Sequence, residues 1–360
     1  MGRLGRLMDS QEATMAQPDD ELLTRHHQLL LRVAGWAPDD VVSAARQWLA
    51  EGRVTEAARA VLGTVLADRV PIRPDDAELL VRTLPDVSQV TQLAGATPAG
   101  DPAAHPAFDF APVRPEPFSP APAPLLLDLT TAELDAEDAA AVAALDEVTG
   151  PVALWRVWRS PQPDRAAGGP VRVHVLETSA DPALLPSATA ALQNALEAAG
   201  VEHPQVEAYT TGVELPSYQR LARGRSALLW ATAKAQPITI ARVFDSYDAG
   251  GGQFRADHPV LSAGTEPAQV LAYLEGGQVL LATTAKETDV FDPGAGAVVP
   301  MSFRTDGRWI WTDTVAYYLS TYALSPDEEF LAHIRALDYR LPTVDAVAEH
   351  RAMSVLADPG

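Results

Sequence analysis

A stretch dense in proline divides this chain of 360 residues. Between Thr97 and Pro124, nine of the 28 residues are proline. Because proline lacks a backbone N–H and has a fixed φ, such a stretch is excluded from helix interiors and from central strands. We therefore expect residues 97–124 to form an extended, semi-rigid linker without a packed core of its own. The linker predicts two modules, one on each side of it.

The segment before the linker is expected to be helical. Residues 1–18 contain no apolar run of the secretory-signal kind, so we expect a disordered N-terminus there. Residues 19–96 carry apolar residues at helical spacing. At 38–40 and 74–76 a proline is followed by two aspartates, which is typical of a helix start. These patterns predict a bundle of three or four helices, close to the lower size limit for independent stability.

The segment 125–360 predicts an α+β domain. Residues 152–159 and 171–177 alternate between apolar and polar side chains across a loop with two glycines, which indicates a hairpin. Asp306-Gly307 stands between two extended runs and predicts a second hairpin with a type I′ turn. Since hairpins pair antiparallel strands, we expect a mixed or antiparallel sheet flanked by helices. Among those helices, one is predicted to begin with Ser325 as its N-cap and Pro326 in its first turn.

The composition restricts the partners and the cellular setting. The formal net charge is −21, which disfavours binding to nucleic-acid phosphates and to anionic membrane surfaces. A basic protein partner fits this charge, although acidity also serves solubility alone. The chain contains no cysteine, so disulfides and cysteine-based metal or catalytic sites are excluded, and we expect a cytoplasmic location. The longest apolar runs are too short to span a bilayer.

No motif in the sequence names a reaction. The glycine-rich stretches 248–253 and 292–297 lack the pattern of a dinucleotide-binding loop, and neither a P-loop nor a G-x-S-x-G elbow occurs. An enzymatic interpretation would use loop carboxylates with one histidine. The candidates for it are Asp245, Asp248, His258, Asp289 and Asp292. Polar loops of this kind are also found simply solvated, and we assign no catalytic residue, metal or cofactor.

Two segments are candidates for binding. The first is the aromatic-rich stretch 301–319, because Trp, Tyr and Arg dominate binding hot spots. Trp309 and Trp311 fall on one face of a strand, either in the core or on an exposed recognition surface. The residues singled out in this stretch are Arg304, Asp306, Arg308, Trp309, Trp311 and Tyr318. The second segment ends a strand at Arg242 and Asp245, which either line a site or pair with each other.

The run from Val298 to Ala336 resembles the ends of proteins found in high-GC bacteria, some of which accompany secreted toxins and other conflict systems. This resemblance implies no particular chemistry. We interpret the chain as a non-enzymatic interaction or accessory factor that binds a protein partner through residues 125–360, in an immunity-type role in its narrowest form. The alternatives are an enzyme that uses the loop carboxylates and His258, and a structural component of a larger assembly.

Overall fold

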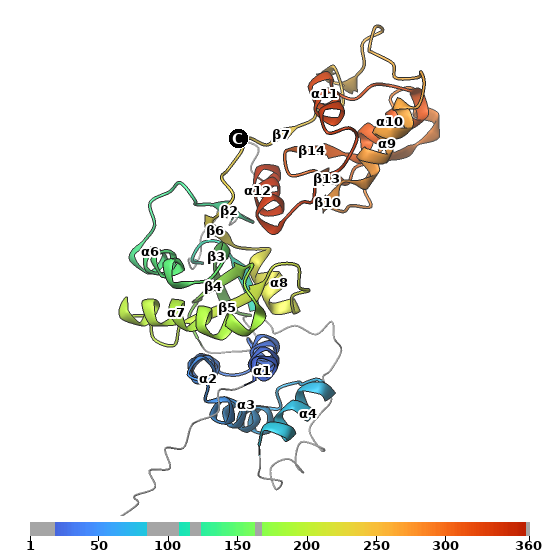
Figure 1. Ribbon diagram of the computed structural model, residues 1–360. Coiled ribbons are helices and arrows are strands. Elements are labelled where there is room, and N and C mark those ends of the chain that lie inside the picture. The colour runs from blue at the N-terminus through green and yellow to red at the C-terminus, as the bar shows by residue number, and fades with distance from the viewer. Residues whose placement is uncertain (1–18, 85–107, 116–123, 163–167, 358–360) are drawn as a thin grey trace, which may run out of the picture. The chain divides into compact units, whose positions relative to one another are not determined.

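The computed structural model describes residues 19–84, 108–115, 124–162 and 168–357 (Figure 1). It has the predicted α+β class, with helices and mixed sheets. The chain forms two compact units. Unit 1 comprises residues 1–106, 143–150 and 179–218, and unit 2 comprises the remaining segments, 107–142, 151–178 and 219–360. The expected disordered N-terminus and most of the expected linker lie outside the described residues.

The boundary between the units differs from the predicted one. Instead of ending at the linker, the helical N-terminal segment shares unit 1 with residues 179–218. Its second helix packs against a helix from that later segment. Arg46 and Glu207 form a fully buried ion pair at 2.6 Å within the same unit. A bundle this small leaves one side of its helices uncovered, and residues distant in sequence cover it.

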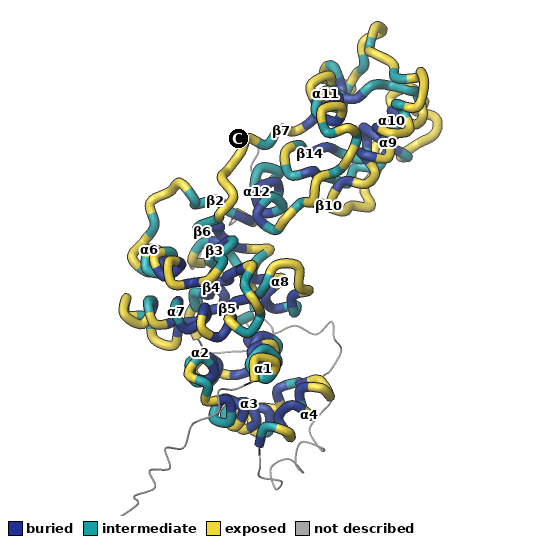
Figure 2. The backbone as a smooth tube through the Cα atoms, in the orientation of Figure 1, coloured by how far each residue is buried: buried dark blue, intermediate teal, exposed yellow. Residues whose placement is uncertain are grey.

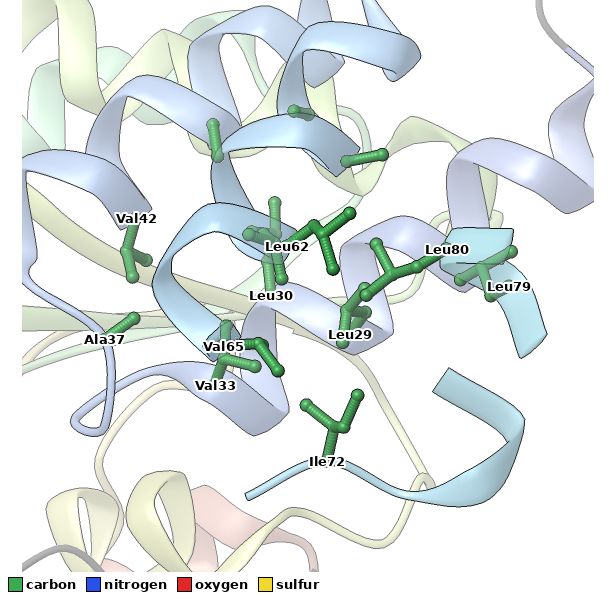
Figure 3. Packing of buried hydrophobic residues seen from close by; sticks show 14 of the residues in the cluster. Leu29, Leu30, Val33, Ala37, Val42, Leu62, Val65, Ile72, Leu79 and Leu80 are labelled. Carbon is green, nitrogen blue, oxygen red and sulfur yellow. The ribbon is translucent and has the colours of Figure 1, made fainter. Parts of the chain in front are cut away.

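Unit 1 is mainly helical. Its helices are α1 (Asp20–Val33), α2 (Asp39–Ala50), α3 (Val54–Asp68), α4 (Pro74–Thr83) and α7 (Leu185–Ala198), with short 3-10 turns η1 (Ala144–Glu147) and η2 (Pro182–Leu184) and strand β5 (Gln205–Thr210). Figure 3 shows the apolar core that α1 to α4 enclose, with Leu29, Leu30, Leu62 and Leu80 near its centre. The predicted helices of residues 19–84 are therefore confirmed.

The burial of His27 makes the stability of unit 1 depend on pH. Its Nε2 donates to the carbonyl of Ala208 at 2.8 Å, and burial lowers its pKa from 6.5 to about 4. The unfolded chain takes up this proton near pH 6.5, whereas the folded chain does so only near pH 4. The free energy of unfolding therefore falls as the pH drops through this window, by about 3 kcal/mol in total.

We expect His27→Gln to remove most of this pH dependence, because its amide can still donate to the Ala208 carbonyl. Urea titrations of wild type and variant at pH 7 and pH 4.5 measure the effect. His26, whose pKa burial also lowers, would retain a smaller dependence of the same sign. Equal losses of stability in the two proteins would contradict the assignment to His27.

Unit 2 contains a mixed sheet built around a long strand. This strand, β3 (Pro151–Pro161), pairs antiparallel with β4 (Val171–Thr178) and with β6 (Ala227–Ala231). β6 pairs in parallel with β2 (Leu127–Asp128). The predicted hairpin of β3 and β4 is confirmed. Helix α6 (Ala136–Ala143) precedes β3, α8 (Ser217–Arg223) precedes β6, and α12 (Ala346–Ala357) contacts β2 and β6.

Part of the predicted linker belongs to this sheet. Residues Phe108–Ala111 form strand β1, which pairs antiparallel with the end of β3. The expectation of a linker without packed structure is therefore wrong for this segment. The reason is local: Phe108–Ala111 is free of proline, so its backbone N–H groups are available to the ladder. Dense proline on both sides limits the strand to four residues.

A second sheet lies in the C-terminal part of unit 2, with the strand order β10-β13-β14-β7. These strands are β7 (Thr239–Ile240), β10 (Gln278–Leu281), β13 (Phe303–Thr305) and β14 (Trp309–Thr312). Helices α9 (Glu266–Gly276), α10 (Asp313–Tyr322) and α11 (Glu328–Ala336) enclose its core. Two further antiparallel pairs complete the unit, β8 (Ser246–Asp248) with β9 (Gly251–Gln253) and β11 (Lys286–Thr288) with β12 (Ala297–Pro300), and η3 (Pro293–Ala295) precedes β12.

Two local predictions in this part need correction. The hairpin of β13 and β14 is present, but four residues connect the pair Thr305–Ile310, and of the two turn residues only Gly307 has a positive φ. The turn is closed by the Asp306 carboxylate, which accepts the backbone N–H groups of the residues two and three positions later, so a type I′ turn is not formed. The N-cap of α11 is Asp327 rather than Ser325, because its carboxylate reaches two first-turn amides.

Candidate functional site

The predicted aromatic hairpin is largely interior. Trp309 and Trp311 do share one face, since both rings pack against Phe330 at centroid distances of 5.1 Å. Trp311 is fully buried, and its indole N–H donates to the carbonyl of Leu274. Tyr318 is also buried. The sequence left two interpretations open, and the structure shows the one in which these side chains lie in the core. Trp311 and Tyr318 are therefore not surface-binding residues, contrary to the prediction.

The polar residues of the hairpin hold elements together. Arg304 donates to Asp313 and to the carbonyls of Glu275 and Gly277, which closes the C-terminal end of α9. Asp306 is buried and accepts from the Tyr273 hydroxyl at 2.5 Å and from His333 at 2.6 Å, in addition to its turn contacts. Arg308 alone is exposed, and it donates to Gln236. These contacts give Arg304 and Asp306 a structural role in the hairpin and its neighbouring elements.

The second predicted segment does reach a cavity. We call it the Arg242 pocket, a cavity of about 560 Å³. Arg242 donates through Nε to Asp327 at 2.6 Å, while Asp245 lies 2.9 Å from Nδ1 of His258. The pairing of Arg242 with Asp245 that the sequence suggested is not formed. The lining also includes Arg255, Val260, Ser325, Glu328 and Arg335.

His258 is held on both sides within this pocket. Its Nδ1 faces the carboxylate of Asp245, and its Nε2 lies 3.0 Å from the carbonyl of Ser325. Both neighbours carry oxygens that accept hydrogen bonds, so each can accept from a ring N–H that faces it. The backbone N–H of Arg255, together with His258, lowers the pKa of Asp245. The contacts at Nδ1 and Nε2 fix the orientation of the imidazole ring within the pocket.

The glycine-rich stretch 248–253 lies within the hairpin of β8 and β9, which spans residues 246–253. Its turn follows Asp248, whose carboxylate accepts the backbone N–H of Gly250. A side chain at Gly252 would overlap the ring of Phe244, so glycine is required for the close approach of these two residues. The hairpin thereby lies directly against an aromatic ring of the core.

A row of aromatic side chains extends from this hairpin to the next one. Phe244 contacts Tyr247 at 5.5 Å and Phe254 at 5.0 Å, and Phe254 stacks on Phe291 at 5.6 Å. Tyr247 is 71% exposed and Phe291 is 50% exposed. We call Tyr247, Phe254, Phe291 and the adjacent Val290 the aromatic surface. Both segments that carry it are mostly exposed (Figure 2).

The two segments that carry the aromatic surface are acidic. Residues 245–257 and 285–292 hold six acidic and two basic side chains, a net charge of −4. Partial burial and the charge of Glu287 raise the pKa of Tyr247. Asp289 is buried, and it accepts from the hydroxyls of Tyr317 and Tyr322 and from the backbone of Phe291. Asp289 thus anchors the segment that carries Phe291, whereas four other carboxylates of the two segments are exposed: Asp248, Asp257, Glu287 and Asp292.

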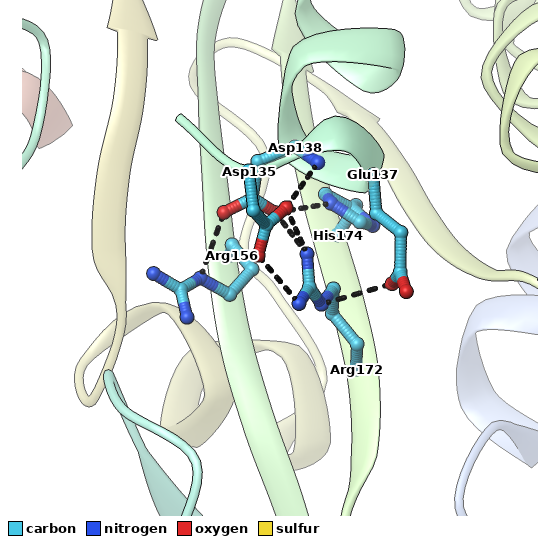
Figure 4. Close-up of polar contacts among 6 residues, drawn as sticks. All are labelled: Asp135, Glu137, Asp138, Arg156, Arg172 and His174. Atoms are coloured by element: carbon cyan, nitrogen blue, oxygen red, sulfur yellow. Dashed lines mark hydrogen bonds and ion pairs between the residues drawn. The ribbon is translucent and has the colours of Figure 1, made fainter. Parts of the chain in front are cut away.

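A charged network covers one face of β3 and β4 (Figure 4). Arg156 lies opposite His174, so both side chains share that face, and Arg172 lies two residues before His174. All three approach the buried carboxylate of Asp138 on α6, at 3.3 Å for Arg156, 2.9 Å for Arg172 and 3.2 Å for His174. Asp135 accepts two bonds from Arg172, which lowers the pKa of its carboxyl to about 2. The network joins three carboxylates to two guanidinium groups and one histidine within the protein, which is typical of a structural element.

Sequence reasoning missed both the aromatic surface and the charged network. The network had a signal, since Arg172 and His174 alternate with valines while aspartates begin the preceding helix. The aromatic surface had a weaker one: Tyr247 ends the segment of Arg242 and Asp245, but Phe291 comes from a distant loop.

Protein-family models, curated proteins and solved structures give no match to this chain. Within the described residues, no three or more His, Asp or Glu side chains are arranged to hold a metal ion. None of the helices in the described part of the chain is both long and apolar enough to cross a bilayer.

Proposed function

We propose that this chain acts by binding a protein partner through the aromatic surface of unit 2. The observation that carries the proposal is the exposure of Tyr247 and Phe291 at the two ends of one packed row of rings. Large rings held from below lose little conformational entropy on binding and are typical of interface hot spots. Exposed apolar groups with a polar rim mark interaction sites.

The rim indicates the charge of the partner. The segments that carry the rings hold four exposed carboxylates, and the whole chain carries a net charge of −21. Complementary charge accelerates encounter and excludes acidic competitors, so the partner that fits is basic. An immunity-type role, with a basic toxin as the partner, is the narrower form of this proposal. It is supported by the charge and by the resemblance of residues 298–336.

The test compares partners captured from lysate of the source organism by the full chain and by two variants. Tyr247→Ala together with Phe291→Ala should lose the specific partner, with at least a tenfold higher Kd once that partner is purified. Val213→Ala, an exposed apolar residue of unit 1, is the matched control and should bind as wild type. The Kd should also rise with added salt. An unchanged set of captured proteins, with both variants folded, would refute the proposal.

A further inference from the structure

The Arg242 pocket carries cationic side chains, although the chain as a whole is acidic. Arg242, Arg255 and Arg335 all line it, and their side chains are 74%, 65% and 50% exposed. The molecule as a whole carries a net charge of −21. These three guanidinium groups offset the three carboxylates of the lining, Asp245, Asp327 and Glu328, so the pocket is close to neutral within an acidic protein.

Two of these arginines have donors that the described residues do not use. Among the residues that the structure describes, Arg242 hydrogen-bonds through Nε alone, to Asp327. Within the described part of the chain, the guanidinium of Arg255 has two ion-pair contacts, at 3.7 Å to Asp245 and 3.5 Å to Asp257, both beyond hydrogen-bond length. Arg335 differs, because its fork is occupied by Glu266. Arg242 and Arg255 can thus donate to a ligand without leaving their present partners.

The carboxylates of the pocket are mostly engaged. Asp327 caps α11 and accepts from Arg242, and Asp245 accepts from His258 and from the backbone of Arg255. Glu328 is the exception, since it is exposed and has no hydrogen bond or ion pair among the described residues. The pocket therefore combines unused cationic donors with one free carboxylate at its lining.

We propose that the Arg242 pocket binds the phosphate group of a small phosphorylated molecule, held by Arg242 and Arg255. A guanidinium presents a planar fork of donors that matches phosphate oxygens, and such charge-assisted bonds are strong. The cavity of about 560 Å³ lies within the range of small-molecule sites and leaves room beyond the phosphate. This proposal is independent of the partner bound by the aromatic surface.

Calorimetric titration of the full chain with pyrophosphate tests this proposal, with inorganic phosphate and citrate as further probes. We expect saturable binding of one pyrophosphate, at least tenfold weaker after Arg242→Gln or Arg255→Gln. Arg82→Gln, which alters an exposed arginine of unit 1 paired with Glu78, should change nothing. Glu328→Gln should tighten binding several-fold, because it removes the free carboxylate. That gain could not come from a loss of folding.

The outcomes separate the alternatives. Absence of saturable pyrophosphate binding would overturn the proposal, and so would equal binding by wild type and both arginine variants. If citrate binds as tightly as pyrophosphate, the pocket binds anions in general, and the assignment to a phosphate group is overturned. The double variant of Tyr247 and Phe291 should still bind pyrophosphate, while Arg242→Gln should still capture the protein partner. Failure of one proposal is thus distinguishable from failure of the other.

Discussion

Asp138→Asn is expected to lower the free energy of unfolding by about 3–5 kcal/mol, because it removes the central acceptor of the charged network. Asp138 is almost fully buried, and Arg156, Arg172 and His174 all approach its carboxylate. Neutralising it removes the carboxylate that Arg156 approaches in a poorly hydrated position, and it leaves Arg172 with Asp135 and Glu137. Replacing one member of a buried ionic cluster costs more than the cluster itself contributes.

The matched control is Glu137→Gln, which alters the neighbouring carboxylate in the same network. Glu137 contacts Arg172 at 3.2 Å, but its side chain is 40% exposed. Solvent screens such a pair, so we expect a change below about 1 kcal/mol. Urea denaturation followed by tryptophan fluorescence measures both variants, since Arg172 lies over the ring of Trp158. Equal midpoints for the two variants would show that Asp138 is not the central acceptor.

Trp311→Ala is expected to destabilise the C-terminal part of unit 2 by about 3–5 kcal/mol, the range for removing a buried tryptophan. The ring is fully buried between Tyr273 and Phe330 and covers Gly277. Its removal leaves a cavity and also deprives the Leu274 carbonyl of its hydrogen bond. Any loss of binding by this variant would reflect unfolding rather than recognition.

Two further substitutions test the packing of Trp311. Trp309→Ala removes a ring that is only partly buried, so its effect should be clearly smaller. Gly277→Ala adds a methyl group that would overlap the Trp311 ring, so it should destabilise although Gly277 has an ordinary backbone conformation. Thermal unfolding monitored by near-UV circular dichroism compares the three. A Tm for Trp311→Ala equal to that of Trp309→Ala would contradict this account.

Local signals predicted much of the fold. The helix starts at 38–40 and 74–76, the alternation in β3 and β4, and the hairpin at Gly307 are all present in the structure. Each depends on residues within a few positions of one another. Two finer predictions, of a helix cap and of a turn type, were wrong because a nearby side chain accepts the backbone N–H groups. Asp327 replaced Ser325 as a cap, and the carboxylate of Asp306 set the turn.

The candidate sites were less accessible to prediction. Arg242 and Asp245 do line one pocket. Their partners, however, are Asp327 and His258, and a pattern among neighbouring residues does not reveal these pairings. The exposed pair Tyr247 and Phe291 shares a surface only because two distant hairpins meet over Phe254. Conversely, aromatic residues that lie close together in sequence predicted a recognition surface, but tertiary packing places these side chains in the core.

Sequence alone determined the α+β class, the absence of cysteine chemistry, the acidic charge and the positions of most helices. These follow from composition and from periodicity along the chain, which act before any distant contact forms. Tertiary structure decided which residues share unit 1, that β1 joins the sheet, and which aromatic rings face solvent. Burial and ion pairing depend on where segments far apart in the chain meet, and no local pattern encodes that meeting.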